Sequence, residues 1–323
     1  MGPAAQVVGQ SPGGARRFSP LLFGVVAFFA LFLSRVVIAE GDSPGAPGDA
    51  APPGQAHAAL SDLELSNFFT AGWNEDWTHH HRFTPDMALL RVTTNFLERE
   101  FRADYSRTDV RGNAIVDTSQ LVNGLIAYGV NRRLMIEVIS NYQWNQANGG
   151  TVASGGGGGA LIRAQLVDSA TVSADFQVKL AIPNKGIGQT QTSVAYAVGA
   201  WQDLHALLPA LGRMGLYESI QYESLLGPAK AGARTSDLAG DVSLAETWTS
   251  PETKGFRNFT TFVEFFATRD LNGTSSGQTI ASITPGIRTW FAPGNSITIG
   301  EDFPLGRPGN FYRVLRITYI LNF

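Results

Sequence analysis

Cysteine is absent from the 323 residues of the chain. Without thiols there can be no disulfide, thiolate metal ligand, cysteine nucleophile or lipid-modified cysteine. Histidine is scarce, with five residues: His57, the run His79–His81 and His205. None falls on a predicted strand face from which it could activate a serine, so a Ser/His hydrolase is not expected. Three adjacent histidines cannot all point one way and have no acidic cluster beside them, so we expect a solvated loop and no metal site.

Charge is also sparse. Charged residues make up 16% of the chain, the net charge is -3 and no basic block occurs, which argues against nucleic acid as a partner. The run Gly155–Gly159 is not followed by the Lys-Ser/Thr of a phosphate-binding loop, and it predicts a flexible loop. We therefore expect no cofactor.

Long apolar runs are missing beyond the N-terminal region. After residue 40 no stretch approaches the roughly 20 apolar residues of a membrane-spanning helix, yet the mean hydropathy is -0.01, too apolar for a disordered chain. Alternation explains both observations, because a transmembrane strand interleaves each lipid-facing residue with a polar one. The clearest example is Thr171–Ile182, where apolar residues alternate with polar ones along almost the whole stretch.

The first 60 residues read as an export region. Arg16 and Arg17 precede an apolar run from Leu21 to Leu33, and small residues lead up to Ala39. This order predicts a signal peptide over 1–39, with an uncleaved helical anchor as the alternative. Residues 40–60 are rich in Pro, Gly and Ala and predict a disordered tether.

Residues 61–86 differ from the tether because four large aromatic side chains fall within ten positions of them: Phe68, Phe69, Trp73 and Trp77. Aromatic residues favour the boundary between lipid and water. Two interpretations follow: the segment docks at the periplasmic mouth of a barrel and narrows or plugs it, or it lies in the membrane interface as an anchor.

The last thirteen residues have the period of a β-strand. Apolar or aromatic residues occupy every second position: Leu315, Ile317, Tyr319, Leu321 and Phe323. This ending resembles the C-terminal strand of bacterial outer-membrane β-barrels, which implies that it closes the barrel and is read by the barrel-assembly machinery. An ordinary half-buried strand is the alternative.

From residue 87 to 323, alternation and turn residues divide the chain into extended segments. The count is twelve, although ten or fourteen remain possible, and it predicts an all-β transmembrane antiparallel barrel. Tight turns are expected at Asn131 and Asp168, and longer loops at Gly149–Gly159 and Leu271–Gly277. The predicted strands are approximately 88–106, 115–130, 132–146, 158–169, 170–183, 188–203, 212–225, 235–250, 255–269, 278–292, 295–303 and 310–323.

Charged residues on the polar faces of these strands should point inward, because a charge at the lipid midplane costs roughly 2–4 kcal/mol. Inside the barrel they form either a paired network that closes the lumen or a polar path for a solute. The candidates for lining the lumen are Glu98, Glu100, Arg102, Asp104, Arg163, Asp175, Lys179, Asp241 and Arg316.

Two stretches resemble a known group of barrels. Leu180–Asn184, which ends an alternating strand, is similar to a pattern in the transporter-like proteins linked to the meta-pathway of phenol degradation, although Lys185 stands before Gly186. Asn67–Arg102 looks like the opening of uncharacterised outer-membrane proteins that resemble this group. The resemblance implies uptake of small, often hydrophobic compounds and carries over no site residues.

Together these features predict a channel or transporter in the outer membrane of a bacterial cell, surrounded by outer-membrane lipid. The main alternative is a plugged barrel with a structural or interaction role. A lipid-modifying barrel enzyme is a third class, and the lack of a suitable histidine argues against it.

Overall fold

The computed structural model describes residues 62–77, 89–91, 95–110, 116–189, 191–227, 233–250, 253–292, 294–305 and 311–323. All of them belong to one compact unit, Pro53–Phe323. The predicted signal peptide, the predicted tether and the run His79–His81 lie outside the described residues.

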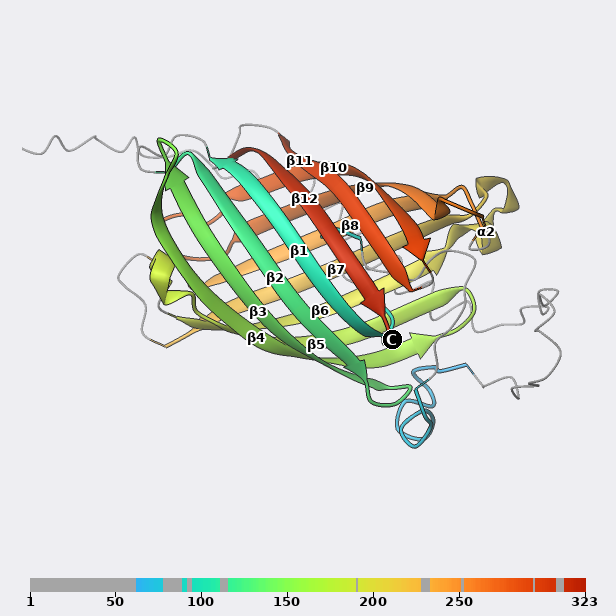
Figure 1. The fold of residues 1–323 in the computed structure, drawn as a ribbon. Coiled ribbons are helices and arrows are strands. Elements are labelled where there is room, and N and C mark those ends of the chain that lie inside the picture. The colour runs from blue at the N-terminus through green and yellow to red at the C-terminus, as the bar shows by residue number, and fades with distance from the viewer. Residues whose placement is uncertain are drawn as a thin grey trace, which may run out of the picture. The chain divides into compact units, whose positions relative to one another are not determined.

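Within the described residues, twelve strands form a closed antiparallel barrel, in which each strand pairs with its neighbours in the chain (Figure 1). The strands are β1 (Arg99–Val110), β2 (Thr118–Gly129), β3 (Leu134–Ala147), β4 (Gly150–Asp168), β5 (Val172–Ile182), β6 (Thr192–Asp203), β7 (Met214–Leu226), β8 (Ser236–Thr247), β9 (Arg257–Asp270), β10 (Thr279–Ala292), β11 (Asn295–Leu305) and β12 (Phe311–Asn322). Short helices interrupt the connections: η1 (Lys185–Ile187), α2 (Leu204–Leu207) and η2 (Pro209–Leu211).

The barrel closes where β1 meets β12. The two strands are paired from Glu100 opposite Asn322 to Val110 opposite Phe311. Beyond the last strand residue, the backbone N–H of Phe323 donates to the carbonyl of Arg99 at 3.0 Å. The prediction of a twelve-stranded antiparallel barrel closed by the C-terminal strand is therefore confirmed.

The polarity of the barrel is inverted relative to a soluble protein. Arg133, Arg163 and Arg288 are among the largest fully buried side chains. Large apolar side chains are instead exposed at alternate positions of the outer face, as at Ile126, Val138 and Ile162. Along the C-terminal stretch Leu315, Leu321 and Phe323 are exposed, and Ile317 and Tyr319 between them are half-buried. An apolar exterior around a polar interior is the arrangement of a barrel that spans a membrane. Among the described residues, no helix combines the length and apolar character needed to cross a bilayer.

The two ends of the barrel differ. At one end, here called the terminal end, β1 begins and β12 finishes, and the turns after β2, β4 and β10 are short. At the opposite end, the loop end, longer connections follow β5, β7 and β9. The predicted tight turns at Asn131 and Asp168 lie at the terminal end.

The prediction of a loop over Gly149–Gly159 is wrong. The chain reverses in only two residues, Asn148 (φ 51°) and Gly149 (φ +80°), and β4 then begins at Gly150. An Asn-Gly pair with both φ angles positive is the favoured two-residue hairpin turn, so the glycine run continues as strand. The lack of side chains in this run lets η1 pack closely against β4, since a Cβ on Gly155 would lie 2.6 Å from Gly186 Cα in η1.

The predicted first strand, 88–106, also begins too early. β1 starts at Arg99, and the described residues before it belong to no strand, although the Glu98 carbonyl accepts from the Gly129 N–H of β2 at 2.9 Å. Residues 89–91 and 95–98 bond instead to side chains of the barrel wall, as described below.

Replacing Phe323 with Asp should remove most of the folded barrel. The change places a carboxylate at the end of the closing strand, beside the last hydrogen bond between β12 and β1. The folded fraction is measured by the faster gel migration of unheated samples. Phe311→Asp, at the other end of β12, is the matched control and should keep most of the compact form. Equal amounts of compact form in wild type and Phe323→Asp would refute the prediction.

Candidate functional site

The interior of the barrel holds a stretch of chain that precedes β1, here called the inner segment (residues 89–91 and 95–98). The backbone N–H groups of Leu90 and Arg91 donate to the Glu264 carboxylate at 3.2 and 3.0 Å. The Asn95 carbonyl accepts hydrogen bonds from Gln165 (3.1 Å) and from the Ser173 hydroxyl (2.6 Å). Wall side chains thus satisfy backbone groups that have no strand partner.

Further along the inner segment, Arg163 donates to the Phe96 carbonyl at 3.0 Å, and the Glu98 N–H points to the sulfur of Met135 at 3.0 Å. Both wall residues are buried. The wall also makes room for this stretch, since a Cβ on Gly199 would lie 2.3 Å from the Asn95 side-chain oxygen. The inner segment is therefore fitted to the wall along its length.

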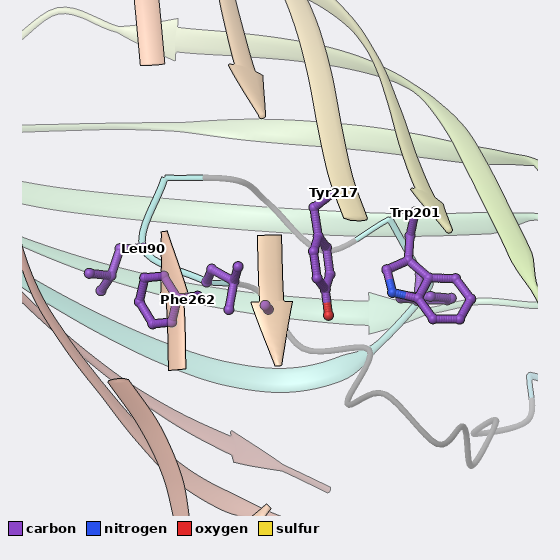
Figure 2. Close-up of a cluster of buried hydrophobic side chains, with 7 residues drawn as sticks. Leu90, Trp201, Tyr217 and Phe262 are labelled. Atoms are coloured by element: carbon purple, nitrogen blue, oxygen red, sulfur yellow. The ribbon is translucent and has the colours of Figure 1, made fainter. Parts of the chain in front are cut away.

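Apolar side chains of the inner segment and the wall form one buried layer across the interior. In Figure 2 the side chains of Leu90, Phe262, Tyr217 and Trp201 follow one another across it. Phe96 packs on Trp201 with ring centroids 5.3 Å apart. The wall members lie near the terminal ends of their strands, so the layer narrows the lumen there. Its members are Leu89, Leu90, Phe96, Trp201, Tyr217, Ala245 and Phe262.

Arg163 is the centre of a buried ion cluster beside this layer. Its guanidinium lies 3.3 Å from Glu137 and 3.2 Å from Asp175, and all three side chains are buried. Opposite charges that share a water-poor interior stabilise each other only while both partners are present. This cluster is the paired network that the sequence left open as one interpretation of the inward charges.

A second cluster ties the inner segment to β11 and β12. Arg91 forms an ion pair with the buried Asp302 and lies 4.2 Å from the ring centre of Phe266. Asp302 also accepts from Arg316 at 2.9 Å and from Thr284 at 2.8 Å. Arg91 thus attaches the inner segment to β11 by an ion pair.

A cavity of about 250 Å³ lies in the lumen against these clusters. Its polar lining carries charges and amides from β1 to β8: Arg102, Asp104, Asn123, Glu137, Asn141, Gln177, Lys179, Ser219, Gln221 and Asp241, together with Arg91 of the inner segment. Within the described part of the chain, Lys179 has no ion-pair partner. Asp241 accepts from Ser219 at 2.9 Å. The cavity therefore offers both a positive and a negative group to a polar solute.

The structure places the nine predicted lumen candidates in the interior. Arg102, Asp104, Lys179 and Asp241 line the cavity, and Arg102 and Asp104 form a pair at 2.7 Å. The others are buried or lie in the ion clusters: Glu98, Glu100, Arg163, Asp175 and Arg316. Sequence analysis did not select Arg91, Glu264 and Asp302 or the aromatic pair Trp201 and Tyr217.

The four aromatic residues predicted as a plug or interface segment lie at the terminal end. Their segment, residues 62–77, is called the rim segment here because it bridges two turns of that rim, with Leu63 paired to Asp168 and Asp76 to Asn131. Phe68 and Trp73 pack against each other at 5.5 Å. None of the four belongs to the apolar layer, which the inner segment forms instead.

An ion pair between Glu75 and Arg132 joins the rim segment to the β2–β3 turn. The hydrogen bond from Arg132 holds the pKa of Glu75 below its ordinary value, with a smaller contribution from the Gly72 N–H. The carboxylate is therefore ionised at neutral pH, and this contact weakens only as the pH falls through that lowered pKa.

His205 lies in α2 at the terminal end, where its backbone N–H donates to the Asp203 carboxylate at 2.9 Å. In the part of the chain that the structure describes, no three His, Cys, Asp or Glu side chains are grouped so that they could hold a metal ion.

Comparisons with known proteins give structural likeness without sequence likeness. No protein-family model and no curated protein matches the sequence. The fold is similar to an outer-membrane channel from Pseudomonas putida F1, with TM-score 0.51 and 10% identity over 74% of this chain and 98% of that one. It is also similar to the NanC porin (TM-score 0.47, 9% identity, 69% and 98% coverage) and the KdgM porin (0.43, 11%, 69% and 99%).

Of these three structures, the first scores above 0.5, and at 10% identity it supports the fold. That fold is the outer-membrane type of β-barrel. The finer resemblance to the phenol meta-pathway group is not shown by these comparisons and stays a prediction.

Proposed function

We propose that the chain is a bacterial outer-membrane channel for small solutes, and that its inner segment narrows the lumen. The observation that carries the proposal is the polar cavity inside a closed, membrane-spanning barrel. If the inward charges served only to stabilise the barrel, each could lie beside an opposite charge. Lys179 instead faces the cavity without an ion-pair partner among the described residues.

The cavity sets the size and polarity of the proposed solute. At about 250 Å³ it is smaller than the roughly 300–1,000 Å³ of pockets for drug-sized molecules. Its amides and mixed charges favour a small hydrophilic molecule, although the resemblance found in the sequence implied hydrophobic compounds. An apolar compound would meet a favourable surface only at the layer formed by Phe96, Trp201 and their neighbours.

A plugged barrel with a structural role is the second candidate. It is favoured by the number of bonds that hold the inner segment, especially those to Glu264, Arg163 and Asp302. A plug that never moves would leave the polar cavity without a path through the terminal end.

Liposome swelling separates the two candidates. Purified folded chain is reconstituted in vesicles, which are then diluted into isotonic solutions of small sugars and amino acids of increasing size. A channel predicts swelling that falls with solute size, and protein-free vesicles from the same lipid set the background. Background swelling with fully folded barrel would favour the plugged alternative.

Orientation gives a separate prediction. If the terminal end faces the periplasm, an epitope inserted at Gly273–Ser276 in the β9–β10 connection should be labelled on intact cells. The same epitope at Ser169 should be labelled only after the outer membrane is permeabilised. Labelling of Ser169 but not of Gly273–Ser276 on intact cells would reverse the orientation. We also propose that the C-terminal strand is the part read by the barrel-assembly machinery.

A further inference from the structure

The rim segment is a folded unit fixed on the barrel, and Arg133 holds it. This side chain is completely buried and donates to the carbonyls of Ala71 (3.0 Å) and Glu64 (3.2 Å) in the rim segment. It also donates to the carbonyls of Gln165 and Leu166 in β4, both at 2.9 Å. One cation therefore binds the rim segment to the wall.

Aromatic packing completes this attachment. The ring of Phe68 lies over the Arg133 guanidinium at 5.1 Å, and Trp73 donates its indole N–H to the Phe68 carbonyl at 2.5 Å. A cation over an aromatic face is attracted by the ring, most strongly where water is excluded. Phe68 and Trp73 are thus explained by the internal packing of the rim segment.

Phe69 and Leu65 are not explained in this way. Phe69 is 89% exposed and Leu65 is 53% exposed. The two are four residues apart in a stretch of helical turns, in which Phe68 N–H bonds to the Leu65 carbonyl and Ala71 N–H to the Asn67 carbonyl. Both residues therefore belong to one short hydrogen-bonded stretch of the rim segment. A rigid unit therefore presents two large apolar side chains outward.

A stack of side chains joins the rim segment to the lipid-facing surface. Arg99 lies between the rings of Trp77 in the rim segment (4.8 Å) and Tyr128 on the outer face of β2 (4.4 Å). Tyr128 is itself half-exposed, and its outward neighbours on β2, Ile126 and Val122, are apolar. The stack links the rim segment directly to the barrel surface that contacts lipid.

The terminal end also carries an aromatic girdle. Aromatic side chains at both edges of a membrane barrel sit where the hydrocarbon meets the headgroups. Exposed aromatic side chains close the strands or connections of this end: Tyr128, Trp248, Phe256, Phe291 and Phe323. In Figure 1 the rim segment (blue) lies at the same end of the barrel as the C-terminus.

We propose that the rim segment is a membrane-surface anchor, and that Leu65 and Phe69 insert into the headgroup region of the phospholipid leaflet at the terminal end. Insertion would remove both apolar side chains from water, which is favourable. The anchor fixes the height and tilt of the barrel at this end. It does not depend on whether the lumen conducts.

The absence of cysteine makes a direct test possible. Phe69→Cys is labelled with a polarity-sensitive dye and reconstituted in phosphatidylethanolamine–phosphatidylglycerol vesicles. Asn74→Cys, an exposed polar position of the same segment, is the matched control. Insertion predicts a blue-shifted emission at position 69, quenching by lipids brominated on the acyl chain and protection from aqueous iodide. The label at position 74 should emit as in water and be quenched by iodide.

Water-like emission and full iodide quenching at position 69 in protein-containing vesicles would overturn the proposal, and would leave the exposed face to a soluble partner. Folding is checked by gel migration before each measurement. If Phe69→Cys does not fold, Leu65→Cys reports on the same stretch of the rim segment and is read by the same criteria. In addition, Phe69→Asp combined with Leu65→Cys should shift the label into water while the barrel remains folded. A label that stays shielded in that variant would contradict insertion through Phe69.

Discussion

Replacing Arg163 with Met should lower the free energy of unfolding of the barrel by about 3–5 kcal/mol, the range for removing one partner of a buried ion pair. Glu137 and Asp175 lie 3.3 and 3.2 Å from its guanidinium and would both lose their cation in a buried setting. The Phe96 carbonyl would lose its donor as well. The measurement is denaturant unfolding of the barrel refolded in vesicles, followed by tryptophan fluorescence and gel migration.

Lys179→Met is the matched control, since it removes an inward cation from the adjacent strand β5. Lys179 has no ion pair within the described residues, so its loss should change the free energy of unfolding by less than about 1 kcal/mol. The triple variant Arg163→Met, Glu137→Gln, Asp175→Asn leaves no unpaired charge in the cluster, so it should recover part of the lost free energy of unfolding. Equal effects of Arg163→Met and Lys179→Met would show that the ion cluster does not hold the wall together.

Replacing Arg91 with Ala should raise solute flux through the barrel several-fold. Arg91 links the inner segment to the wall by its ion pair with Asp302, and it also stacks on Phe266. The wall should remain intact, because Asp302 keeps its bonds to Arg316 and Thr284. With this link removed, the segment should leave the lumen for a larger fraction of the time. The rate of liposome swelling with a small sugar measures the change.

Arg313→Ala is the control for flux. Arg313 pairs with Asp109 at 2.7 Å, but its side chain is exposed near the loop end of β12. Its removal deletes an ion pair of similar geometry without touching the inner segment, so swelling should match wild type. Unchanged swelling in Arg91→Ala, with the barrel folded, would mean that the segment stays in the lumen without this link or that it does not limit flux.

Alternation along the sequence was enough to predict the barrel, its strand number and the inward direction of its charges. Those features depend on which face of each strand meets lipid. A charged residue such as Asp175 points inward because a charge in the hydrocarbon of the membrane would destabilise the barrel. Turn positions were predicted less well. Asn148-Gly149 is itself a hairpin signal, but the glycine run after it was interpreted as part of a loop.

The inner segment could not be predicted from its own residues. The alternation of Glu98, Glu100, Arg102 and Asp104 with less polar residues predicts a strand, and the predicted strand was extended from there back to residue 88. What keeps this stretch out of the sheet is a set of side chains distant in sequence, such as Glu264, which accepts bonds from residues 173 and 174 positions earlier. Local periodicity contains no information about such contacts.

Other residues of the site were not predicted for similar reasons. Strand β9 carries aromatic residues on both faces, with Phe262 in the buried layer and Phe265 exposed, and this masked the alternation that would have pointed to Glu264. Trp201 stands near the end of a strand, where an aromatic residue is also typical of an interfacial girdle. The structure instead buries it completely against Phe96. A large aromatic near a strand end is compatible with either face, and only the partner inside the barrel decides between them.

Single-channel recording in planar bilayers tests the proposed channel most directly. Full-length chain, shown to be folded by gel migration, is compared with Arg91→Ala under the same salt and voltage. We predict discrete conductance steps for the wild type and larger or longer steps for Arg91→Ala. Silence from both proteins over many confirmed insertions would contradict a channel narrowed by its inner segment.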